Sequence, residues 1–313
     1  MRSPLSAQVL FRISVATSLA VITTALSGPV PAQAAPPTVV AVDGTLCDLT
    51  RTLVASSAKV TCLIPPGGDP HGYRLKPSDR QALSRAALVV HIGFGLTPAA
   101  KKISSPGKVV AVGELALPSY RGNDPHVWHS PASTAAMVKV IANNLAPILP
   151  AQDRADLAAR SSRAQAVLAS LDQWGASQVN ALPKPRRVLV TDHKAYSHLT
   201  DRYGIEQITM LDSYTTGGVL RPSSLKKITA AVKASQAKTI FAGSVPTTKT
   251  LKRISRSTGL PIASTPLYAE GLAPGQSAVS TATLNICTFL KGQGGSCDQV
   301  AAEQLATRWK TIR

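Results

Sequence analysis

Four residues that can ligate a metal ion lie far apart along the chain, each after a short apolar segment or within a proline-containing turn. They are His71, His126, His193 and Glu270, in a chain of 313 residues with only six histidines. Consecutive members are separated by 55, 67 and 77 residues. This spacing excludes a zinc finger and a helical His-x-x-x-His site, whose ligands lie within a few residues of one another. It fits four ligands delivered by four separate loops.

The first two histidines belong to a motif that occurs twice. Asp69-Pro70-His71 and Asp124-Pro125-His126 are each followed two positions later by an aromatic residue, Tyr73 or Trp128. Proline fixes its own φ and pushes the preceding residue toward an extended conformation, so each motif predicts a rigid turn that presents an imidazole at a defined angle. This geometry favours a ligand over a core histidine. The two aromatic residues are expected to line the pocket.

The other two candidates each follow an apolar segment. His193 ends the segment Val188-Leu-Val-Thr-Asp-His193, and Glu270 lies in Pro266-Leu-Tyr-Ala-Glu270-Gly271. Each is therefore expected at the carboxyl end of a strand, where open α/β sheets bind ligands.

The three remaining histidines are weaker candidates. His129 lies three residues after His126 and could share its face. We expect His91 and His198 to be packed or at the surface.

Three neutral imidazoles and one carboxylate suit a four-coordinate metal ion. Nitrogen ligands favour zinc over manganese, which prefers oxygen, although copper would also bind this set. Four protein ligands leave no position for a water nucleophile, so the set favours capture over catalysis. Because protonated imidazole cannot ligate, we expect metal affinity to fall below about pH 6.5.

Short apolar segments alternate with amphipathic segments along both halves of the chain. The predicted strands, by residue number, are 38–42, 60–64, 88–92, 108–112, 187–190, 239–242 and 261–263. The predicted helices include 46–58, 77–87, segments that begin near residues 131 and 222, 196–203, 247–258 and a final helix at 277–290. This alternation predicts an α/β fold of two lobes, each with a mostly parallel sheet flanked by helices.

One long helix is predicted between the two halves. Residues 151–182 are rich in Ala, Arg, Asp, Gln and Leu and contain no proline, which indicates a rigid helix about 45 Å long at 1.5 Å per residue. The predicted organisation is an N-terminal lobe at 35–150, this linking helix at 151–182, and a C-terminal lobe at 183–313. Two lobes that face each other form a cleft, with two candidate ligands on each side.

Residues 1–34 have the pattern of a cleavable signal peptide. Arg2 and Arg12 lie in the stretch before the apolar run 13–26, and Pro31-Ala-Gln-Ala34 supplies an Ala-x-Ala cleavage site. The run is too short for a stable membrane anchor, and no cysteine at the cleavage site offers a point for lipid attachment. We therefore expect a protein exported to the periplasm.

Four cysteines fit an exported protein. An even count in an oxidising compartment favours disulfides over metal ligation, and no Cys-x-x-Cys occurs. Local pairing, Cys47 with Cys62 and Cys287 with Cys297, is the simplest of the three connectivities.

The formal net charge is +18, but the basic residues are scattered and few aromatic residues are interleaved with them. Base stacking needs such aromatic residues, so the composition argues against a nucleic-acid partner. A solvated basic face is the simpler interpretation, and attraction to an acidic surface or partner stays open.

Together these motifs resemble the metal-binding class of periplasmic substrate-binding proteins of ABC transporters, of the zinc-uptake type. The resemblance covers nearly the whole chain after residue 34. It rests on several short motifs in the family's order: Asp69-Pro-His-Gly-Tyr73, Pro77-Ser-Asp79, Gly93-Phe-Gly-Leu96, Asp124-Pro-His-Val-Trp128, Thr191-Asp-His193 and Leu267-Tyr-Ala-Glu270.

The resemblance implies a function without enzymatic activity. His71, His126, His193 and Glu270 match the family's four metal ligands. The implied role is extracytoplasmic capture of zinc(II) in the cleft by a monomer, with delivery to an ABC-type membrane permease. The alternatives are the same role for manganese or iron, a secreted zinc hydrolase, and a basic surface-binding module.

The chain departs from the family's usual pattern at three places near the site. His129-Ser130 stands where Leu-Asp is usual, and Thr97 and Gly243 stand where acidic residues are common. The histidine-rich loop of many zinc members is absent. Since neighbouring residues orient metal-ligating imidazoles, these departures bear on affinity and selectivity.

Overall fold

The apolar segments of the first half form a parallel sheet, sheet A. Its strands are β1 (Thr38–Ala41), β2 (Lys59–Cys62), β3 (Leu88–His91) and β4 (Lys108–Ala111), which pair in the order β2-β1-β3-β4. The strand β1 pairs with β2 on one side and with β3 on the other. The winding of the chain therefore reverses at β1, and such a point opens a crevice outside the carboxyl ends of the strands.

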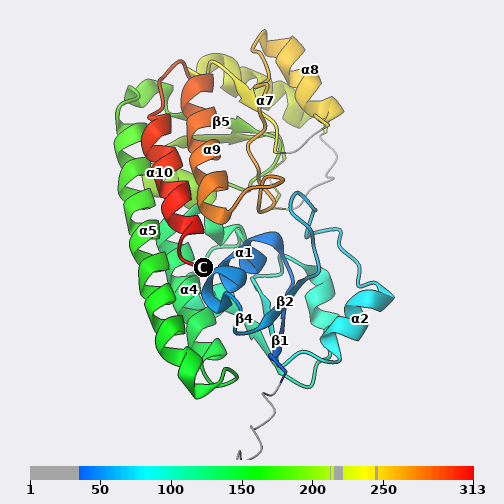
Figure 1. The fold of residues 1–313 in the computed structure, drawn as a ribbon. Helices are drawn as coiled ribbons and strands as arrows, with labels where there is room; N and C mark the ends of the chain where they lie inside the picture. Colours follow the sequence, from blue (N-terminus) through cyan, green and yellow to red (C-terminus); the bar gives the residue numbers. More distant parts are fainter. Residues whose placement is uncertain (1–34, 212, 215–220, 244–245) are drawn as a thin grey trace, which may run out of the picture. The chain divides into compact units, whose positions relative to one another are not determined.

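A second parallel sheet, sheet B, contains β5 (Val188–Thr191), β6 (Glu206–Thr209) and β7 (Ile240–Phe241) in the order β6-β5-β7. The strand predicted at 261–263 is only an isolated bridge between Ile262 and Ile240. The strand β6 was not predicted, because this edge strand is polar and only partly buried. Two parallel sheets flanked by helices confirm the predicted α/β class (Figure 1).

The structure, a computed structural model, describes residues 35–211, 213–214, 221–243 and 246–313. Residues 36–313 form one compact unit, and the predicted signal peptide at 1–34 lies outside the described residues. Within the described part, no helix is both long enough and apolar enough to span a bilayer. The α-helices are α1 (Gly44–Val54), α2 (Pro77–Leu83), α3 (Val112–Ala116), α4 (Pro131–Leu145), α5 (Arg154–Asn180), α6 (Ser197–Tyr203), α7 (Pro222–Ala234), α8 (Lys249–Thr258), α9 (Ala278–Gly292) and α10 (Gln299–Lys310).

The long helix between the two sheets is α5, preceded by a 3-10 turn at Ala151–Asp153. Its 27 residues span about 40 Å. It packs against α1 and α4 of the first half and against α6, α9 and α10 of the second, and Figure 1 shows it in green alongside both. A Cβ at Gly175 would lie 2.6 Å from the hydroxyl of Tyr203, so glycine permits this close approach of α5 to α6. The lobe boundaries proposed from the sequence stay a prediction.

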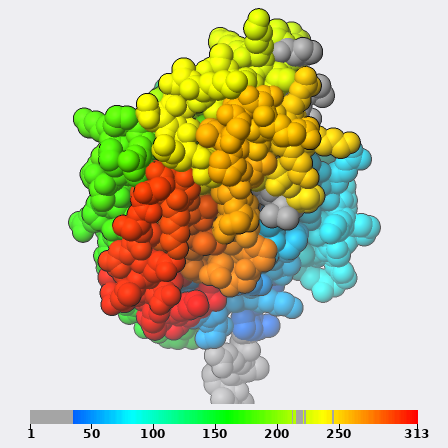
Figure 2. Space-filling view, turned by 90° about the horizontal axis from the view of Figure 1, so that it is seen from above, coloured from blue at the N-terminus to red at the C-terminus, as the bar shows by residue number. Residues whose placement is uncertain are grey.

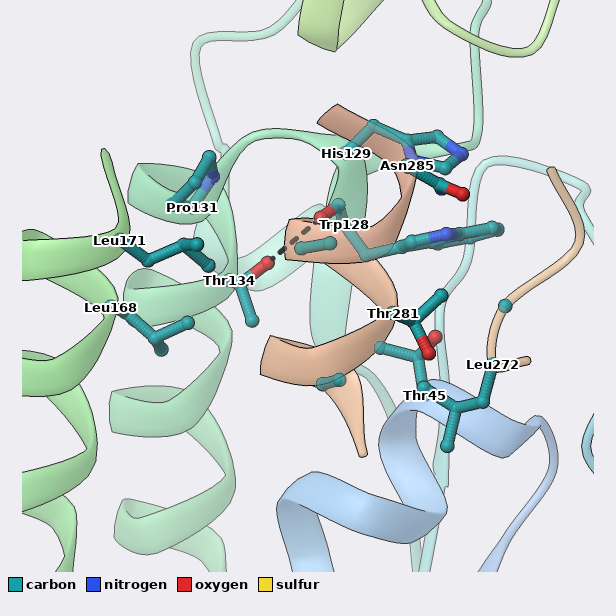
Figure 3. Close-up of a pocket in the computed structure, with 13 residues that line it drawn as sticks. Thr45, Trp128, His129, Pro131, Thr134, Leu168, Leu171, Leu272, Thr281 and Asn285 are labelled. Carbon is teal, nitrogen blue, oxygen red and sulfur yellow. Dashed lines mark hydrogen bonds between the residues drawn. The ribbon is translucent and has the colours of Figure 1, made fainter. Parts of the chain in front are cut away.

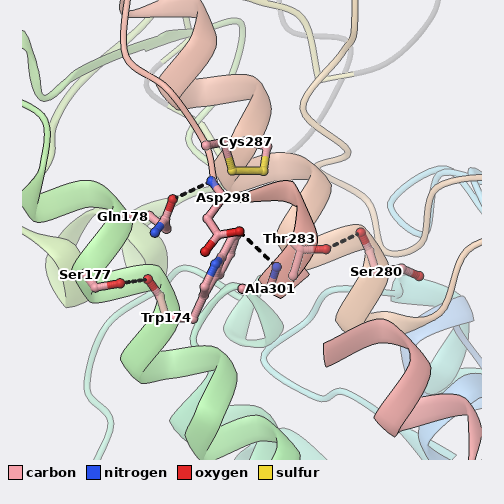
Figure 4. Close-up of a disulfide and its surroundings, with 9 residues drawn as sticks. Trp174, Ser177, Gln178, Ser280, Thr283, Cys287, Asp298 and Ala301 are labelled. Atoms are coloured by element: carbon pink, nitrogen blue, oxygen red, sulfur yellow. Dashed lines mark hydrogen bonds between the residues drawn. A yellow bond between two sulfur atoms is a disulfide. The ribbon is translucent and has the colours of Figure 1, made fainter. Parts of the chain in front are cut away.

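The final helix, α10, was not predicted, since sequence analysis ended the helices at residue 290. Its apolar residues nevertheless recur at helical spacing, with Ala302, Leu305 and Trp309 buried. Asp298 caps it by accepting a hydrogen bond from the N–H of Ala301 (3.0 Å). The turn before it is fixed by the Cys287–Cys297 disulfide, beside which the N–H of Asp298 donates to Gln178 of α5 (Figure 4).

Both predicted disulfides are present. Cys47–Cys62 joins α1 to the end of β2, with Cα atoms 5.7 Å apart, and Cys287–Cys297 joins α9 to the turn before α10, with Cα atoms 5.2 Å apart. These separations lie within the ordinary range for a disulfide. Each bond therefore stabilises one end of the described chain by restricting its unfolded states.

A buried carboxylate on α1 ties the last two helices to the first half. Asp48 accepts hydrogen bonds from the N–H of Ala278 (2.8 Å) and from the indole N–H of Trp309 (2.9 Å), and it pairs with Arg313. Its side chain is 8% exposed. The carboxylate thus holds the start of α9 and the end of α10 against α1.

We expect Asp48→Ala to lower the free energy of unfolding by about 3 kcal/mol, because it leaves buried donors without an acceptor. Chemical denaturation followed by circular dichroism measures this change. Asp156→Ala is the matched control, since Asp156 is 78% exposed and pairs only within α5. It should cost no more than about 0.5 kcal/mol. Equal losses in the two variants would contradict the role of Asp48.

Candidate metal centre

The loop between β2 and α2 carries His71. The carboxylate of Asp69 accepts the backbone N–H of His71 (2.8 Å), which closes a tight turn around Pro70. Tyr73, expected to line the pocket, has its hydroxyl bound to Asp79 Oδ2 (2.5 Å) at the start of α2. This bond ties the loop to α2 and so helps to fix the position of His71.

The second Asp-Pro-His turn holds its imidazole more tightly. His126 is fully buried, and Asp124 Oδ1 accepts both its backbone N–H (3.0 Å) and its ring Nδ1–H (2.7 Å). A carboxylate can only accept, so Nδ1 carries a proton and Nε2 is directed away from Asp124. Burial raises the pKa of Asp124, but its hydrogen bond to His126 outweighs that effect and lowers the pKa to about 2.

An aspartate also orients His193, which follows β5. Asp192 Oδ1 accepts the backbone N–H and the ring Nδ1–H of His193, each at 3.0 Å. The Nε2 atom lies 2.8 Å from Glu270 Oε1. Aspartate therefore fixes the ring orientation of two of the three histidines, as expected for imidazoles that ligate metal.

Glu270 lies on a segment that runs beside the carboxyl end of β7. The N–H of Leu267 donates to Ala242 (2.9 Å), and the hydroxyl of Tyr196 donates to the carbonyl of Leu267 (2.6 Å). Asn285 of α9 binds both the N–H and the carbonyl of Tyr268. The backbone before Glu270 is thus fixed from β7, from α9 and from the residue before α6.

The structure brings the four predicted residues together. One ligand atom from each lies within 4.8 Å of the ligand atoms of the others. Glu270 Oε2 is 3.1 Å from His71 Nε2 and 3.4 Å from His126 Nε2, and these two ring nitrogens are 3.2 Å apart. Ligands of a tetrahedral zinc ion, each about 2 Å from the metal, lie roughly 3.3 Å apart. These three separations are close to that value, and the other pairs of ligand atoms lie within 4.8 Å.

The charges of the cluster also suit a cation. Burial alone would lower the pKa of His193, but hydrogen bonds to Asp192 and Glu270 outweigh it and raise the pKa to about 10. The pKa of His126 is likewise raised by Asp124 and Glu270 against the effect of burial. Burial would raise the pKa of Glu270, yet the histidines hold it far below its usual range. The surroundings therefore favour positive charge beside an ionised carboxylate.

One buried atom of the cluster has no hydrogen bond of suitable geometry. Glu270 Oε2 is buried without such a partner, although His71 Nε2 is only 3.1 Å away. A buried carboxylate oxygen without a partner is costly. An ion held by Glu270 and the three Nε2 atoms would satisfy this oxygen, so the residues fit a bound metal.

His129 is not among the converging ligand atoms. Its Nε2–H instead donates to the carbonyl of Ala269 (3.0 Å), the residue before Glu270. Burial, and then the charge of His126, lower the pKa of His129 to about 3, so the ring is neutral. Its role in this structure is to join the turn after His126 to the segment that carries Glu270.

The other two histidines are outside the cluster, as expected. His198 Nε2–H donates to the carbonyl of Asp124 (3.1 Å), and His91 is half-buried at the end of β3. The roles of Asp124 and Asp192 in orienting the imidazoles were not predicted. Their positions in the sequence could have indicated these roles, because Asp124 lies two residues before His126 and Asp192 lies directly before His193.

The departure at residue 243 leaves little room for a larger side chain. A Cβ at Gly243 would lie 3.1 Å from Asp192 Oδ1 and 3.5 Å from His193 Cε1. Asp192 therefore occupies the space beside His193 that an acidic residue at 243 would need. The acid that orients His193 is instead Asp192, the residue after β5.

A small cavity lies behind the turn that follows His126. Its volume is about 20 Å³, and its lining includes Thr45, Trp128 and His129 (Figure 3). The indole N–H of Trp128 and the hydroxyl of Thr45 are buried without protein partners. This volume is large enough for one water molecule.

Comparison with known proteins places the chain among metal-binding proteins. Residues 39–287 match the family described as the periplasmic component A of the zinc-uptake complex. Relatives include the manganese-binding lipoprotein MntA of Halalkalibacterium halodurans (26% identity over 79% of this chain and 85% of that protein). The zinc-binding protein TroA of Treponema pallidum is 28% identical over 66% of this chain and 69% of that protein.

Solved structures share the fold. The periplasmic zinc-binding protein TroA of Treponema pallidum superposes with a TM-score of 0.77 at 24% identity and covers 83% of this chain and 99% of its own. The Fe(III)-bound YtgA of Chlamydia trachomatis gives a TM-score of 0.76 at 22% identity, with coverages of 83% and 99%.

The match spans most of the chain, and the proteins of this class are solute-binding components of ABC transporters rather than enzymes. This removes the hydrolase alternative. The chain is a metal-binding periplasmic component of an ABC transporter and belongs to the family of component A of the zinc-uptake complex.

Proposed function

We propose that this protein captures zinc(II) outside the cytoplasm with His71, His126, His193 and Glu270 and delivers it to an ABC-type permease. The convergence of three Nε2 atoms and one buried carboxylate is the observation that carries the proposal. Residues 1–34 would direct export as a signal peptide. The protein would act as a monomer, with a membrane permease as its partner.

The choice of zinc rests on the donor atoms. Three imidazole nitrogens and one carboxylate suit zinc, whereas manganese prefers a site richer in oxygen. Relatives are described as binding zinc, manganese or iron. Among these ions, the donor set supports zinc.

Capture would couple the two halves of the molecule. His71 and His126 follow strands of sheet A, while His193 follows β5 and Glu270 lies beside the end of β7. An ion that needs all four ligands stabilises the arrangement in which they converge, by its preference for that state. Since α5 packs along both halves, we expect the relative movement to be small.

Removing a ligand tests the site directly. Partners that merely orient a ligand typically change metal affinity about 10- to 100-fold. We therefore expect alanine at position 71, 126, 193 or 270 to raise the Kd for zinc by more than about 100-fold, and Asp124→Asn to raise it by about 10- to 100-fold. Competition titration of metal-free protein with a chromophoric chelator measures these values.

His91→Ala is the control, because His91 lies outside the cluster and should leave the Kd unchanged. The same titrations with manganese and iron test the choice of ion. Tighter binding of manganese than of zinc at equal free concentration would contradict the zinc assignment.

The protonation of the site sets its pH dependence. With the pKa of His193 raised to about 10, a proton occupies its imidazole at pH 7, and the metal must displace it. Zinc affinity should therefore rise by at least about tenfold per pH unit between about pH 6 and 8, instead of levelling off above pH 6.5.

Calorimetry in two buffers of different ionisation enthalpy counts the protons released on binding. At pH 7 we expect at least about one proton per ion. An affinity that is level above pH 7, with no proton release, would contradict the hydrogen-bonded state of His193.

His129 is expected to act as a positioning residue. His129→Leu removes the donor to Ala269 and frees the segment that carries Glu270, so the Kd for zinc should rise about tenfold, the lower end of the range for groups that position a ligand. His129→Gln keeps an N–H donor and should restore part of the affinity. A leucine variant that binds zinc as tightly as the parent would refute this role.

A further inference from the structure

A strongly basic surface lies on the two helices α7 and α8. Between residues 213 and 269 the sequence has nine lysines and arginines and no acidic residue, a net charge of +9. The rest of the chain from residue 35 has 23 basic and 16 acidic residues, a net charge of +7 over about four times as many residues. More than half of the net positive charge of the chain from residue 35 is therefore concentrated in one segment.

All nine basic side chains of this segment are exposed. The helix α8 buries Leu251 and Ile254 and exposes Lys249, Lys252, Arg253 and Arg256. The helix α7, which packs against α8, buries Leu225 and Val232 and exposes Lys226, Lys227 and Lys233. The apolar residues thus face the protein, and the charges remain in solvent.

The charges of this surface are not neutralised by the residues that the structure describes. None of the nine basic residues forms an ion pair with any residue that the structure describes, whereas Arg160, Arg202 and Arg313 elsewhere do. Figure 2 looks onto this end of the compact unit, where the side chains of α7 and α8, in yellow and amber, cover part of the surface. A surface with this many unneutralised like charges attracts anions.

The composition of the surface indicates the kind of partner. The segments of α7 and α8 contain no aromatic residue, so they offer neither base stacking for single-stranded nucleic acid nor the aromatic anchors of a protein interface. Six of the nine basic residues are lysines, and protein interfaces are depleted in lysine. Flexible point charges suit a bilayer with anionic headgroups, where no fixed geometry is required.

We propose that the basic surface of α7 and α8 binds the anionic phospholipid surface of the membrane in which the permease lies. The apolar faces of both helices are buried in the protein, so the contact is electrostatic and peripheral. It holds the protein near the bilayer without occupying the metal ligands, none of which lies on α7 or α8. The proposal does not depend on which metal the site binds.

Co-sedimentation of the protein without residues 1–34 with lipid vesicles tests the proposal. Binding to phosphatidylcholine vesicles that contain phosphatidylglycerol should be strong at low salt and fall steeply as salt rises, and pure phosphatidylcholine should bind weakly. Each basic side chain near an anionic bilayer contributes about fivefold to binding. Replacing Lys226, Lys227, Lys249 and Lys252 with glutamine should therefore weaken vesicle binding by at least about 50-fold.

The matched control removes the same charge elsewhere. Glutamine at positions 59, 101, 102 and 139 replaces four other exposed lysines, so the net charge of the two variants is equal. The control should bind vesicles within a few-fold of the parent, and both variants should keep the parent's Kd for zinc and its unfolding midpoint. If both variants lost vesicle binding equally, the binding would depend on the net charge of the whole protein, and the proposal of a localised surface would be overturned.

The same variants decide between partners. If the α7 and α8 variant binds anionic vesicles as the parent does, the lipid proposal is refuted. Lysine-dependent binding to permease in neutral-lipid vesicles, without binding to phosphatidylglycerol, would assign the surface to an acidic protein partner and overturn it as well. Vesicle binding does not depend on the metal ligands, so its result is the same whether or not their alanine variants lose zinc. The proposal of zinc capture and the proposal of lipid binding can therefore fail independently.

Discussion

The burial of Glu270 among three imidazoles is the interaction on which the site depends. A buried carboxylate is costly unless opposite charge and hydrogen bonds compensate it. Here His193 Nε2 lies 2.8 Å away, and hydrogen bonds to Asp192 and Glu270 raise the pKa of His193 to about 10, which favours a proton as the compensating charge when no metal is bound. A divalent cation at the same point supplies more positive charge and also satisfies the buried Oε2 atom of Glu270. Protons and metal therefore compete for one set of atoms.

The orientation of the imidazoles couples the two halves of the molecule. Asp124 holds the ring of His126 through Oδ1, and its Oδ2 accepts the N–H of Ser197 at the start of α6 (3.0 Å). A second hydrogen bond joins the two halves, and here the donor lies in the first half. His129, in the turn after His126, donates to the carbonyl of Ala269, the residue before Glu270. The hydrogen bonds that position the ligands of one sheet thus depend on the position of the other sheet. Binding and the relative placement of the halves are therefore linked through the same few residues.

Local chemistry explains what could be predicted from the sequence. The repeated Asp-Pro-His turn and the polar ends of apolar strands are local patterns, so they indicated the four residues that the structure brings together. The α/β class followed from the alternation of strands and helices. The hydrogen bond between Asp124 and Ser197 joins residues 73 apart, and no local pattern encodes such a contact. The polar edge strand β6 was missed for a related reason, because its pairing with β5 rather than its own hydrophobicity defines it.

The connections between the halves limit how the protein can discriminate between metals. The helix α5 packs along both halves, and Asp48 on α1 also holds the ends of α9 and α10. A large opening would break these buried hydrogen bonds, each of which costs about 1 to 3 kcal/mol to leave unmade. A small rotation would preserve them and still separate His71 and His126 from His193 and Glu270. Selection must then come from the donor atoms and their fixed orientation rather than from a wide closure. Release of the ion would require one pair of ligands to move away from the other, which would also strain the hydrogen bonds of Asp124 to Ser197 and of His129 to Ala269. Contact with a permease or protonation of the imidazoles would favour this change.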